Sequence, residues 1–327
     1  MKNPLVSVII PTKNSANLLE PCLSGIRDQT YKNIEIIISD GLSEDNTLEI
    51  AKAYGGKIIT NKKILAEPGV RLGFQKANGE IFIVIAVDNI FKEKNAIEAI
   101  VKVFENKEIY AAFPKHESTK SDNLLTKYTN TFTDPFNHFV YGYAANARTF
   151  NKVFKTLTHN SIYDVYDFKS GKIMPMLALA QGFSVRKDFI NTKRNEMDDI
   201  APIIELIKEG RKIAYVHSVG LYHHTISNLG HFVRKQRWGA KNALSKKEFG
   251  IGSRLSTLSA QQKMRMYLFP IYSLSIVIPC INSVFHILKG EEKMWLFDPF
   301  ISFISGASII YEYGKMKLGL SKSISRL

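Results

Sequence analysis

Acidic side chains stand at the ends of two apolar runs in the sequence. The run EIFIVIAVDNIF is broken by Asp88 and Asn89, and the run IEIIIS is followed directly by Asp40. Mg²⁺ and Mn²⁺ prefer oxygen ligands and usually accept few of them from protein, so one carboxylate at a strand end can suffice to bind such an ion. Asp and Asn also cap the turns that follow strands. The residues alone therefore leave a ligand-binding role and a turn-capping role open.

A second pair of acids, Asp198 and Asp199, comes directly before an apolar repeat at helical spacing. A positioned carboxylate can remove the proton of a hydroxyl nucleophile as that hydroxyl attacks. At the start of a helix the dipole favours the ionised form of a carboxylate, and acidic side chains there also serve as N-caps. Two adjacent acids allow both roles, with one side chain capping the helix and the other acting as a base.

Nitrogen-containing side chains supply the remaining candidates. His223 and His224 follow the strand-like segment KIAYV, and an imidazole can replace a missing carboxylate ligand. We expect this of His224, with a structural histidine as the alternative. Arg71 has a guanidinium that suits phosphate, or it is a solvated surface residue. Arg237 and Trp238, in the segment RKQRWG, could contact phosphate or a membrane surface, or lie on an exposed basic helix face.

Apolar, β-branched runs alternate with segments of helical periodicity in the first half of the chain. Strands are expected at LVSVII, IEIIIS, GKIIT and IFIVIAV, with helices between them, one of which has Ser43 as its N-cap candidate. This pattern is typical of a mostly parallel sheet covered by helices on both faces. Ligands bind such sheets at the carboxyl ends of the strands, where Asp40 and Asp88 lie.

The composition limits the class of protein. The chain has 327 residues, 45% of them apolar and 23% charged, which suits a folded protein with one large α/β domain and an appendage, or with two domains. The formal charge of +14 suggests an anionic partner such as a nucleotide or a phospholipid surface. No aromatic sheet motif or recognition helix supports nucleic acid. Two distant cysteines and an N-terminus without a signal-peptide core indicate a cytoplasmic catalytic part.

Two apolar stretches near the C-terminus predict membrane attachment. The first, residues 266–288, contains no Lys, Arg, Asp or Glu, and it is long enough for a bilayer, which takes about 20 residues. The second, PFISFISGASIIY, has a length nearer to that of a re-entrant or interfacial segment. Basic residues precede the first and follow the second, so a hairpin with both flanks cytoplasmic obeys the positive-inside tendency. Helices that lie in the interface, or that pack in an oligomer, are the alternatives.

Ordered segments of the chain resemble the successive motifs of family-2 inverting glycosyltransferases with the GT-A fold. The segments are VSVIIPTKN, QTYKNIEIIISDGLSEDNT, GFQKANGEIFIVIAVDN and DDIAPIIELIKEGRKIAYV. The resemblance covers roughly residues 5–245 and implies a Rossmann-like α/β fold, with a mixed, mostly parallel sheet flanked by helices. It also implies that a sugar moves from a nucleotide-diphosphate sugar to an acceptor with inversion, and that a divalent metal, Mg²⁺ or Mn²⁺, is the cofactor.

The resemblance implies roles for individual residues. Asp40 would bind the nucleotide base, Asp88 matches the last acid of the Asp-X-Asp metal motif, and Asp199 matches the general base. Asp198 takes the position of the neighbouring Glu. The loop that would lie along the nucleotide contains Pro11, Thr12 and Asn14.

Further residues follow from the resemblance or depart from it. In some relatives a histidine near His224 binds the metal or the diphosphate, and the stretch with Arg237 and Trp238 is similar to the basic aromatic segment of membrane-linked members. We expect Asp198, Arg237 and Trp238 to contact acceptor or phosphate. Ala86 replaces the first acid of Asp-X-Asp, and Gly41 replaces a second acid that usually follows the second strand.

Three parts are predicted along the chain. Residues 1–230 would form the catalytic domain, with 1–110 as its nucleotide-binding half and 111–230 as its acceptor half. Residues 231–265 would form a basic amphipathic linker, and residues 266–327 a hydrophobic membrane-associated segment.

The expected function is an inverting, hexosyltransferase-like enzyme of glycan biosynthesis. Its catalytic domain would lie at the cytoplasmic face of the cell membrane and serve a lipid-linked or envelope glycan acceptor. A polyprenyl-phosphate sugar transferase is one alternative. A catalytically silent tether that binds nucleotide sugar is another, which Ala86 keeps open. The expected partners are the donor, the acceptor, the membrane and possibly further copies of the chain, but not nucleic acid.

Overall fold

The structure is a computed structural model of the chain, and it describes residues 3–191, 198–245 and 250–320. The described residues form two compact units. The sheet unit consists of Met1–Glu117, Phe150–Gly171 and Leu177–His223, and the helical unit of Ser118–Thr149, Lys172–Met176 and His224–Leu327. The expected functional boundaries at residues 110, 230 and 265 stay predictions.

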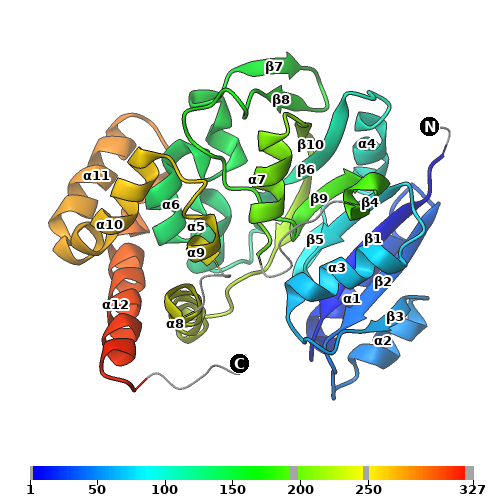
Figure 1. Cartoon of the computed structure of the whole chain (residues 1–327), viewed down its shortest axis with the longest axis horizontal. Coiled ribbons are helices and arrows are strands. Elements are labelled where there is room, and N and C mark those ends of the chain that lie inside the picture. The colour runs from blue at the N-terminus through cyan, green and yellow to red at the C-terminus, as the bar shows by residue number, and fades with distance from the viewer. Residues whose placement is uncertain (1–2, 192–197, 246–249, 321–327) are drawn as a thin grey trace. The chain divides into compact units, whose positions relative to one another are not determined.

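The sheet unit is built on a mixed sheet with helices around it (Figure 1). Ten strands of the described chain take part, in the order β3-β2-β1-β4-β9-β6-β10-β8-β7, with β5 paired to β10. Their bounds are β1 Val6–Thr12, β2 Ile34–Asp40, β3 Lys57–Thr60, β4 Ile81–Ile85, β5 Asn89–Phe91, β6 Ile109–Glu117, β7 Thr156–His159, β8 Asp164–Tyr166, β9 Gln181–Arg186 and β10 Lys212–His223.

The direction of the strands fixes which ends meet. Strands β1, β2, β3 and β4 are parallel to one another, β9 is antiparallel to both β4 and β6, and β10 is parallel to β6. Strands β4, β6 and β10 therefore run in the same direction as β1 and β2. This confirms the mixed, mostly parallel sheet expected from the sequence.

Helices cover the two faces of the sheet because side chains alternate along its strands. Val6, Val8 and Ile10 of β1 belong to a core cluster with apolar residues of α1 and α4. Ile9 points to the other face, where a Cβ added to Gly73 of α3 would lie 2.3 Å from its Cγ2 atom. The helices of this unit are α1 Ala16–Arg27, α2 Thr47–Ala53, α3 Ala66–Lys76, α4 Ala96–Val103, η3 Lys187–Asn191 and α7 Ala201–Lys208, and η2 Ala147–Lys152 begins in the helical unit and ends in this one.

The helical unit has an aromatic core of its own. Tyr128, Phe132, Phe232, Trp295 and Ile301 are buried together. Its elements are α5 Leu124–Phe132, α6 Pro135–Tyr141, η1 Gly142–Ala144, α8 Leu229–Ser245, α9 Gly250–Arg254, α10 Ala260–Ser275, α11 Val277–Leu288, η4 Lys293–Phe297 and α12 Asp298–Lys317.

The two C-terminal apolar stretches differ from the expectation. The first, which was expected to be the longer span, is broken at Ile276, where φ is 55°, and α10 and α11 meet there at 97°. The second is one continuous helix, and Lys293–Lys317 is long and apolar enough by length and composition to cross a membrane. Local hydrophobicity alone did not reveal the break, because it lies in the backbone conformation of a single residue.

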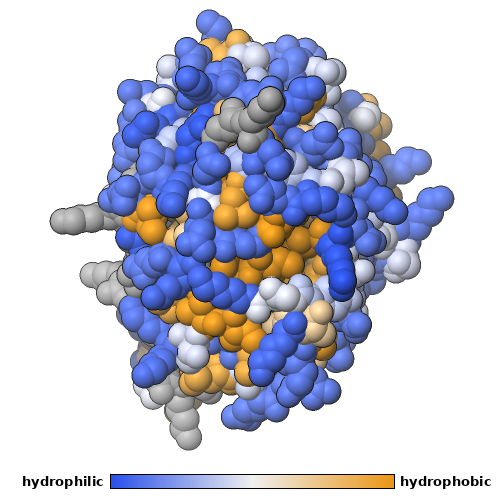
Figure 2. Space-filling view, turned by 90° about the vertical axis from the view of Figure 1, so that its right-hand side faces the viewer, coloured by the Kyte–Doolittle hydropathy of each residue, from blue (hydrophilic) through white to orange (hydrophobic). Residues whose placement is uncertain are grey.

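Apolar side chains are exposed on the outer faces of α10 and α11. Tyr267 and Ile271 of α10 are 73% and 64% exposed, and Ile281 and Leu288 of α11 are 66% and 81% exposed. A contiguous exposed apolar surface of this kind marks an interaction site, often with a membrane. Figure 2 shows another gathering of hydrophobic residues, in the middle of the face that it displays and surrounded by hydrophilic ones.

Candidate active site

The carboxyl ends of β1, β2, β4, β6 and β10 lie along one edge of the sheet, since these strands run in the same direction. Thr12 ends β1, Asp40 ends β2 and His223 ends β10, while Asp88 lies in the turn that follows β4. The edge therefore brings together residues that are far apart in the sequence, as the alternation of strands and helices predicts.

Asp40 is buried in a network of short hydrogen bonds and is only 4% exposed. Its Oδ1 accepts from the Ser43 hydroxyl at 2.5 Å and from the Thr12 hydroxyl at 3.2 Å, and its Oδ2 accepts from the Ser43 N–H at 2.9 Å. The prediction of Ser43 as a helix N-cap was wrong, because α2 begins at Thr47 with Asn46 as its N-cap. The Asp40 carboxylate, three residues earlier, takes up both donors of Ser43 instead.

The loop after β1 is tied to the same network. Asn14 has a φ of 45°, its N–H donates to the Ser43 hydroxyl at 2.8 Å, and its Oδ1 accepts from the Glu44 N–H at 2.8 Å. Asn tolerates this left-handed backbone better than most residues. The two loops that follow β1 and β2 are thus fixed to each other, which holds Thr12 and Asp40 in place.

The absence of an acid at Gly41 has a steric reason. A Cβ at this position would lie 2.9 Å from the Ile64 carbonyl oxygen and 3.2 Å from the Thr12 carbonyl oxygen. Backbone atoms cannot give way as a flexible side chain can, so any larger side chain would displace the loop. The chain therefore presents one carboxylate at the end of β2.

Helix α3 approaches the strand ends at the same edge. A Cβ at Gly69 would lie 3.4 Å from the Cβ of Pro11, which places the start of α3 against the end of β1. Arg71 lies two residues further along α3, and its Nη1 atom is buried without a hydrogen-bond acceptor among the described residues. A buried guanidinium nitrogen without an acceptor suits an anionic ligand.

Asp88 has a histidine beside it. His223 Nε2 lies 3.5 Å from Asp88 Oδ2, and the side chains are 18% and 20% exposed, respectively. Pairing of β10 with β5 sets this position, since His223 is in register with Asn89. Asn89 also donates to Asp88 Oδ1 at 3.2 Å. His223 and Asn89 thus orient the Asp88 carboxylate, part of which stays accessible.

The neighbouring histidine has a different partner. His224 Nδ1 lies 2.7 Å from an Asp122 carboxylate oxygen in the helical unit. Its expected role as a metal ligand stays a prediction. The end of β10 is the feature that would have identified His223, because β10 is paired with β5 as far as this residue. Sequence periodicity did not locate that end.

The side chains around Asp88 fit a divalent cation. A carboxylate oxygen and an imidazole nitrogen 3.5 Å apart can both reach one ion, and the remaining positions would be left for oxygen ligands of a substrate or water. Ala86 contributes no side-chain ligand. Cys22 is not available either, because burial and the nearby Asp88 charge raise the pKa of its thiol, so the thiol stays protonated.

A second group in the sheet unit could also hold a cation. His159, Asp164 and His217 have ligand atoms within 4.8 Å of one another. They come from β7, β8 and the middle of β10 rather than from the carboxyl ends of β1, β2 and β4. Two cation sites therefore have to be distinguished by experiment.

Asp198 and Asp199, the two acids before α7, make different contacts. Asp198 is 4% exposed, and its Oδ1 accepts from the backbone N–H of Ile200 at 2.8 Å and of Ala201 at 2.7 Å. Its side chain therefore holds backbone N–H groups at the start of α7, while Ile200 occupies the N-cap position. Asp199 is half-buried and its carbonyl accepts from the Leu179 N–H at 3.0 Å, so its backbone is fixed without its side chain serving as the cap.

Arg237 has a protein partner in the helical unit. Its Nε and Nη2 atoms both lie 2.7 Å from Glu312 Oε1, and its guanidinium stacks over the Tyr311 ring at 4.4 Å. Glu312 is 3% exposed, so the pair joins α8 to α12 inside the unit. Trp238 is half-buried on α8. A contact of Arg237 or Trp238 with phosphate stays a prediction.

Comparison with known proteins shows the family to which the chain belongs. Residues 7–171, half of the chain, match the family described as glycosyl transferase family 2. An uncharacterised glycosyltransferase of Rickettsia typhi is 37% identical over 112 residues, which are 33% of this chain and 35% of that protein. The chain thus spans about a third of the length of this relative.

Two further proteins match nearly the whole chain. A Methanococcus voltae protein is 24% identical over 332 residues, 95% of this chain and 96% of that protein, and is named dolichyl N-acetyl-alpha-D-glucosaminyl phosphate 3-beta-D-2,3-diacetamido-2,3-dideoxy-beta-D-glucuronosyltransferase. The mannosyltransferase PcManGT of Pyrobaculum calidifontis, solved with GDP-Man and Mn²⁺, superposes with a TM-score of 0.56 at 12% identity, covering 95% of this chain and 87% of that one. Together with the mixed sheet, the likeness to PcManGT confirms the expected GT-A fold.

Proposed function

Since the chain belongs to glycosyl transferase family 2, we propose that it moves a sugar from a nucleotide-diphosphate sugar to a lipid-linked or envelope glycan acceptor at the cytoplasmic face of the membrane. The observation that carries the proposal is the meeting of Asp40, Asp88 and His223 along one edge of the sheet.

The donor would lie across the carboxyl ends of β1 and β2. The Asp40 carboxylate, held by Thr12 and Ser43, keeps further acceptor capacity for a base N–H, because an ionised carboxylate has about four lone-pair sites. Asn14 and Pro11 line the loop beside it. Arg71 would supply a guanidinium for the diphosphate, which gives its buried Nη1 atom an acceptor.

Asp88 and His223 would hold the divalent cation. Such an ion stabilises the leaving diphosphate as a Lewis acid. Asn89 keeps the Asp88 carboxylate oriented through its 3.2 Å hydrogen bond. The pairing of β10 with β5 fixes His223 opposite Asn89, so both ligands come from paired strands or from the turn beside them.

Asp199 would act as the base. Asp198 takes up the free N–H groups at the start of α7, which leaves Asp199 near the positive end of the helix dipole, where its ionised form is favoured. It would accept the proton of the acceptor hydroxyl as the oxygen attacks the anomeric carbon. The electron pair of the bond to the diphosphate leaves with the nucleotide.

Membrane contact through α10 and α11 would supply the acceptor. Their exposed outer faces are apolar, whereas α12 packs polar groups such as Ser305, which donates to Gln236 at 2.7 Å, and Glu312 inside the unit. We therefore favour interfacial attachment through the bent helix pair. The name of the Methanococcus voltae relative describes a dolichyl-phosphate-linked acceptor, which supports a lipid-linked acceptor here.

A donor screen with the full chain tests the proposal. The purified protein is incubated in lipid bicelles with nucleotide sugars, Mn²⁺ and lipid-linked glycan acceptors, and both nucleotide release and acceptor mass are measured. We expect one donor to release nucleotide and to add one sugar to the acceptor. A product of polyprenyl phosphate and a single sugar would favour the alternative acceptor, and tight donor binding without release would favour a silent tether.

Replacing the candidate ligands one by one identifies the metal site. His223→Ala is expected to raise the Mn²⁺ concentration that half-activates the enzyme about tenfold or more, because loss of a ligand weakens metal binding. His159→Ala, which removes a ligand of the other cluster, should leave that concentration within about twofold. Metal titrations of activity give the values.

The same titration tests the histidine expected from the sequence. His224→Ala is included because His224 faces Asp122 through a 2.7 Å contact. If His159→Ala or His224→Ala weakens activation by Mn²⁺ while His223→Ala does not, the assignment to Asp88 and His223 is wrong.

A further inference from the structure

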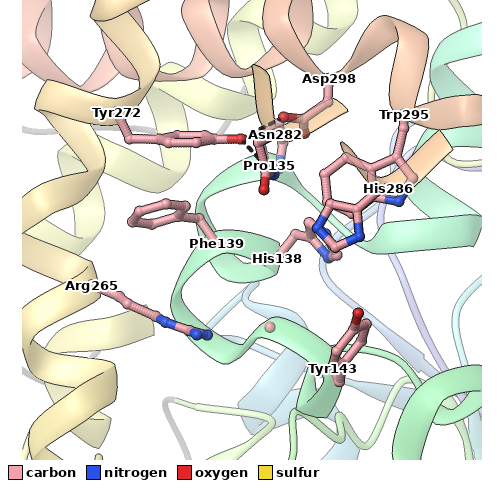
Figure 3. A pocket seen from close by; sticks show the side chains of 11 residues that line it. Pro135, His138, Phe139, Tyr143, Arg265, Tyr272, Asn282, His286, Trp295 and Asp298 are labelled. Carbon is pink, nitrogen blue, oxygen red and sulfur yellow. Dashed lines mark hydrogen bonds between the residues drawn. The ribbon is translucent and has the colours of Figure 1, made fainter. Parts of the chain in front are cut away.

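The helical unit contains a cavity that the proposed transfer reaction does not use. It has a volume of about 220 Å³ and is lined by residues of α6, η1, α10, α11, η4 and α12. Figure 3 shows Arg265 reaching into it from one side, while Tyr272, Asn282 and Asp298 meet on the other. All of its lining residues belong to the helical unit.

Arg265 is a half-buried cation that has no counter-ion within the described part of the chain. It lies on the inner face of α10 with Phe269 and Tyr272, and it makes no hydrogen bond or ion pair with the residues that the structure describes. Burial lowers the pKa of its guanidinium. A desolvated charge is costly unless an opposite charge accompanies it, so the position is one that an anion would stabilise.

The glycine at position 142 leaves room for the Arg265 side chain. A Cβ added to Gly142 would lie 2.5 Å from Arg265 Nη1, and Gly142 has a φ of 55°. Glycine is the residue that adopts this backbone conformation without strain. The turn after α6 therefore lets the guanidinium lie directly against the backbone at the cavity wall.

The acidic group of the cavity is already satisfied. Asp298 accepts from the hydroxyls of Tyr128 at 2.5 Å, Tyr272 at 2.8 Å and Ser302 at 3.3 Å. These donors stabilise its charge without Arg265. An anionic ligand would thus meet Arg265 on the side of the cavity away from Asp298.

Among the titratable groups in and around the cavity, Arg265 is the one that would pair with an anion. Glu291 accepts from Tyr143 at 2.8 Å and lies 3.0 Å from His286 Nδ1. Burial lowers the pKa of His138, so this imidazole is neutral near pH 7. Trp295 is 4% exposed and its Nε1 has no acceptor in the described part of the chain, which offers a further donor.

From this geometry we propose that the cavity binds the phosphate group of a lipid, with Arg265 as its principal contact. A guanidinium matches phosphate oxygens in a planar, bidentate manner. The source is a lipid rather than free phosphate because the walls are largely aromatic and because the outer faces of α10 and α11 present exposed apolar side chains. The inference rests on the membrane contact in the proposed function but not on sugar transfer.

Tryptophan fluorescence provides a direct test. The chain has two Trp, so Trp238→Phe leaves Trp295 in the cavity wall as the reporter. The full chain is titrated with dihexanoyl phosphatidic acid, with dihexanoylglycerol and with inorganic phosphate. We expect a saturable change with phosphatidic acid, and weaker binding of the diacylglycerol, which lacks the phosphate, and of inorganic phosphate, which lacks the chains.

A matched pair of variants separates a specific contact from general charge. Arg265→Gln and Lys263→Gln each remove one positive charge from α10, but Lys263 is exposed and lies outside the cavity. Arg265→Gln should weaken phosphatidic acid binding about tenfold to hundredfold, and Lys263→Gln by less than about twofold. Arg265→Lys keeps the positive charge but loses the bidentate geometry of the guanidinium, so its affinity for phosphatidic acid should lie between those of the two Gln variants. Thermal melts show whether each variant is folded.

The other outcomes overturn the proposal. Equal binding of phosphatidic acid by Arg265→Gln and by its parent, or equal binding of the diacylglycerol, would show that the cavity is not a phosphate site. Inorganic phosphate that binds as tightly as phosphatidic acid would overturn the lipid as the source. Because the readout is binding rather than turnover, a chain that transfers no sugar can still give the expected titration, and the two proposals fail separately.

Discussion

Asp88→Asn is expected to lower kcat about 10³-fold or more and to abolish activation by Mn²⁺. An amide keeps the shape of the side chain but not the charge that holds a cation on the leaving diphosphate. Lewis-acid stabilisation is worth several kcal/mol, and a loss of about 4 kcal/mol corresponds to about 10³-fold in rate. The measurement is the rate of nucleotide release at saturating donor and acceptor over a range of Mn²⁺.

A neighbouring cluster supplies the control for Asp88. Asp164→Asn makes the same change of charge at the group formed with His159 and His217, and its activity should stay within about threefold of the parent, as for a residue that contacts no reacting group. An Asp88→Asn enzyme that retains full activity with unchanged Mn²⁺ dependence would contradict the proposed metal site. Circular dichroism of both variants excludes unfolding as the cause of any loss.

Asp199→Asn is expected to lower kcat about 10²- to 10⁴-fold while the KM for donor changes little, because general-base catalysis contributes at this scale and donor binding does not use the base. The loss should appear with an acceptor that attacks through a hydroxyl. An acceptor phosphate is already anionic and needs little help from a base, so a small effect with polyprenyl phosphate as the acceptor would identify that alternative reaction.

Asp198→Asn is the matched control, since it makes the same change one residue earlier. Asn caps helices about as well as Asp, so the cap at Ile200 and Ala201 is kept. Its kcat is therefore expected to fall much less than that of Asp199→Asn. The assignment of the base fails if Asp198→Asn causes the large loss and Asp199→Asn does not.

Much of the sheet unit was predictable because its strands are near-continuous apolar runs. A parallel arrangement places the ends of such strands on one edge, so Asp40 and Asp88 could be expected there from their positions alone. Asp198 and Asp199 were readable as a pair of acids at a helix start, and Asp198 is the one whose side chain accepts from the backbone N–H groups there.

The details that escaped depend on contacts between distant segments. Which of His223 and His224 lies beside Asp88 depends on where β10 stops pairing with β5, and Ser43 is drawn from a helix start to Asp40 across a turn. Likewise, the break at Ile276 is a property of one φ angle inside a stretch without Lys, Arg, Asp or Glu. Hydrophobic periodicity carries no information on any of these.

The 97° angle between α10 and α11 has a consequence for how this protein would meet its acceptors. Two short apolar arms at a right angle can rest in one leaflet and withdraw from it again. The enzyme would then search in two dimensions, so its rate should follow the number of acceptor molecules per unit of membrane area rather than per volume of cytoplasm.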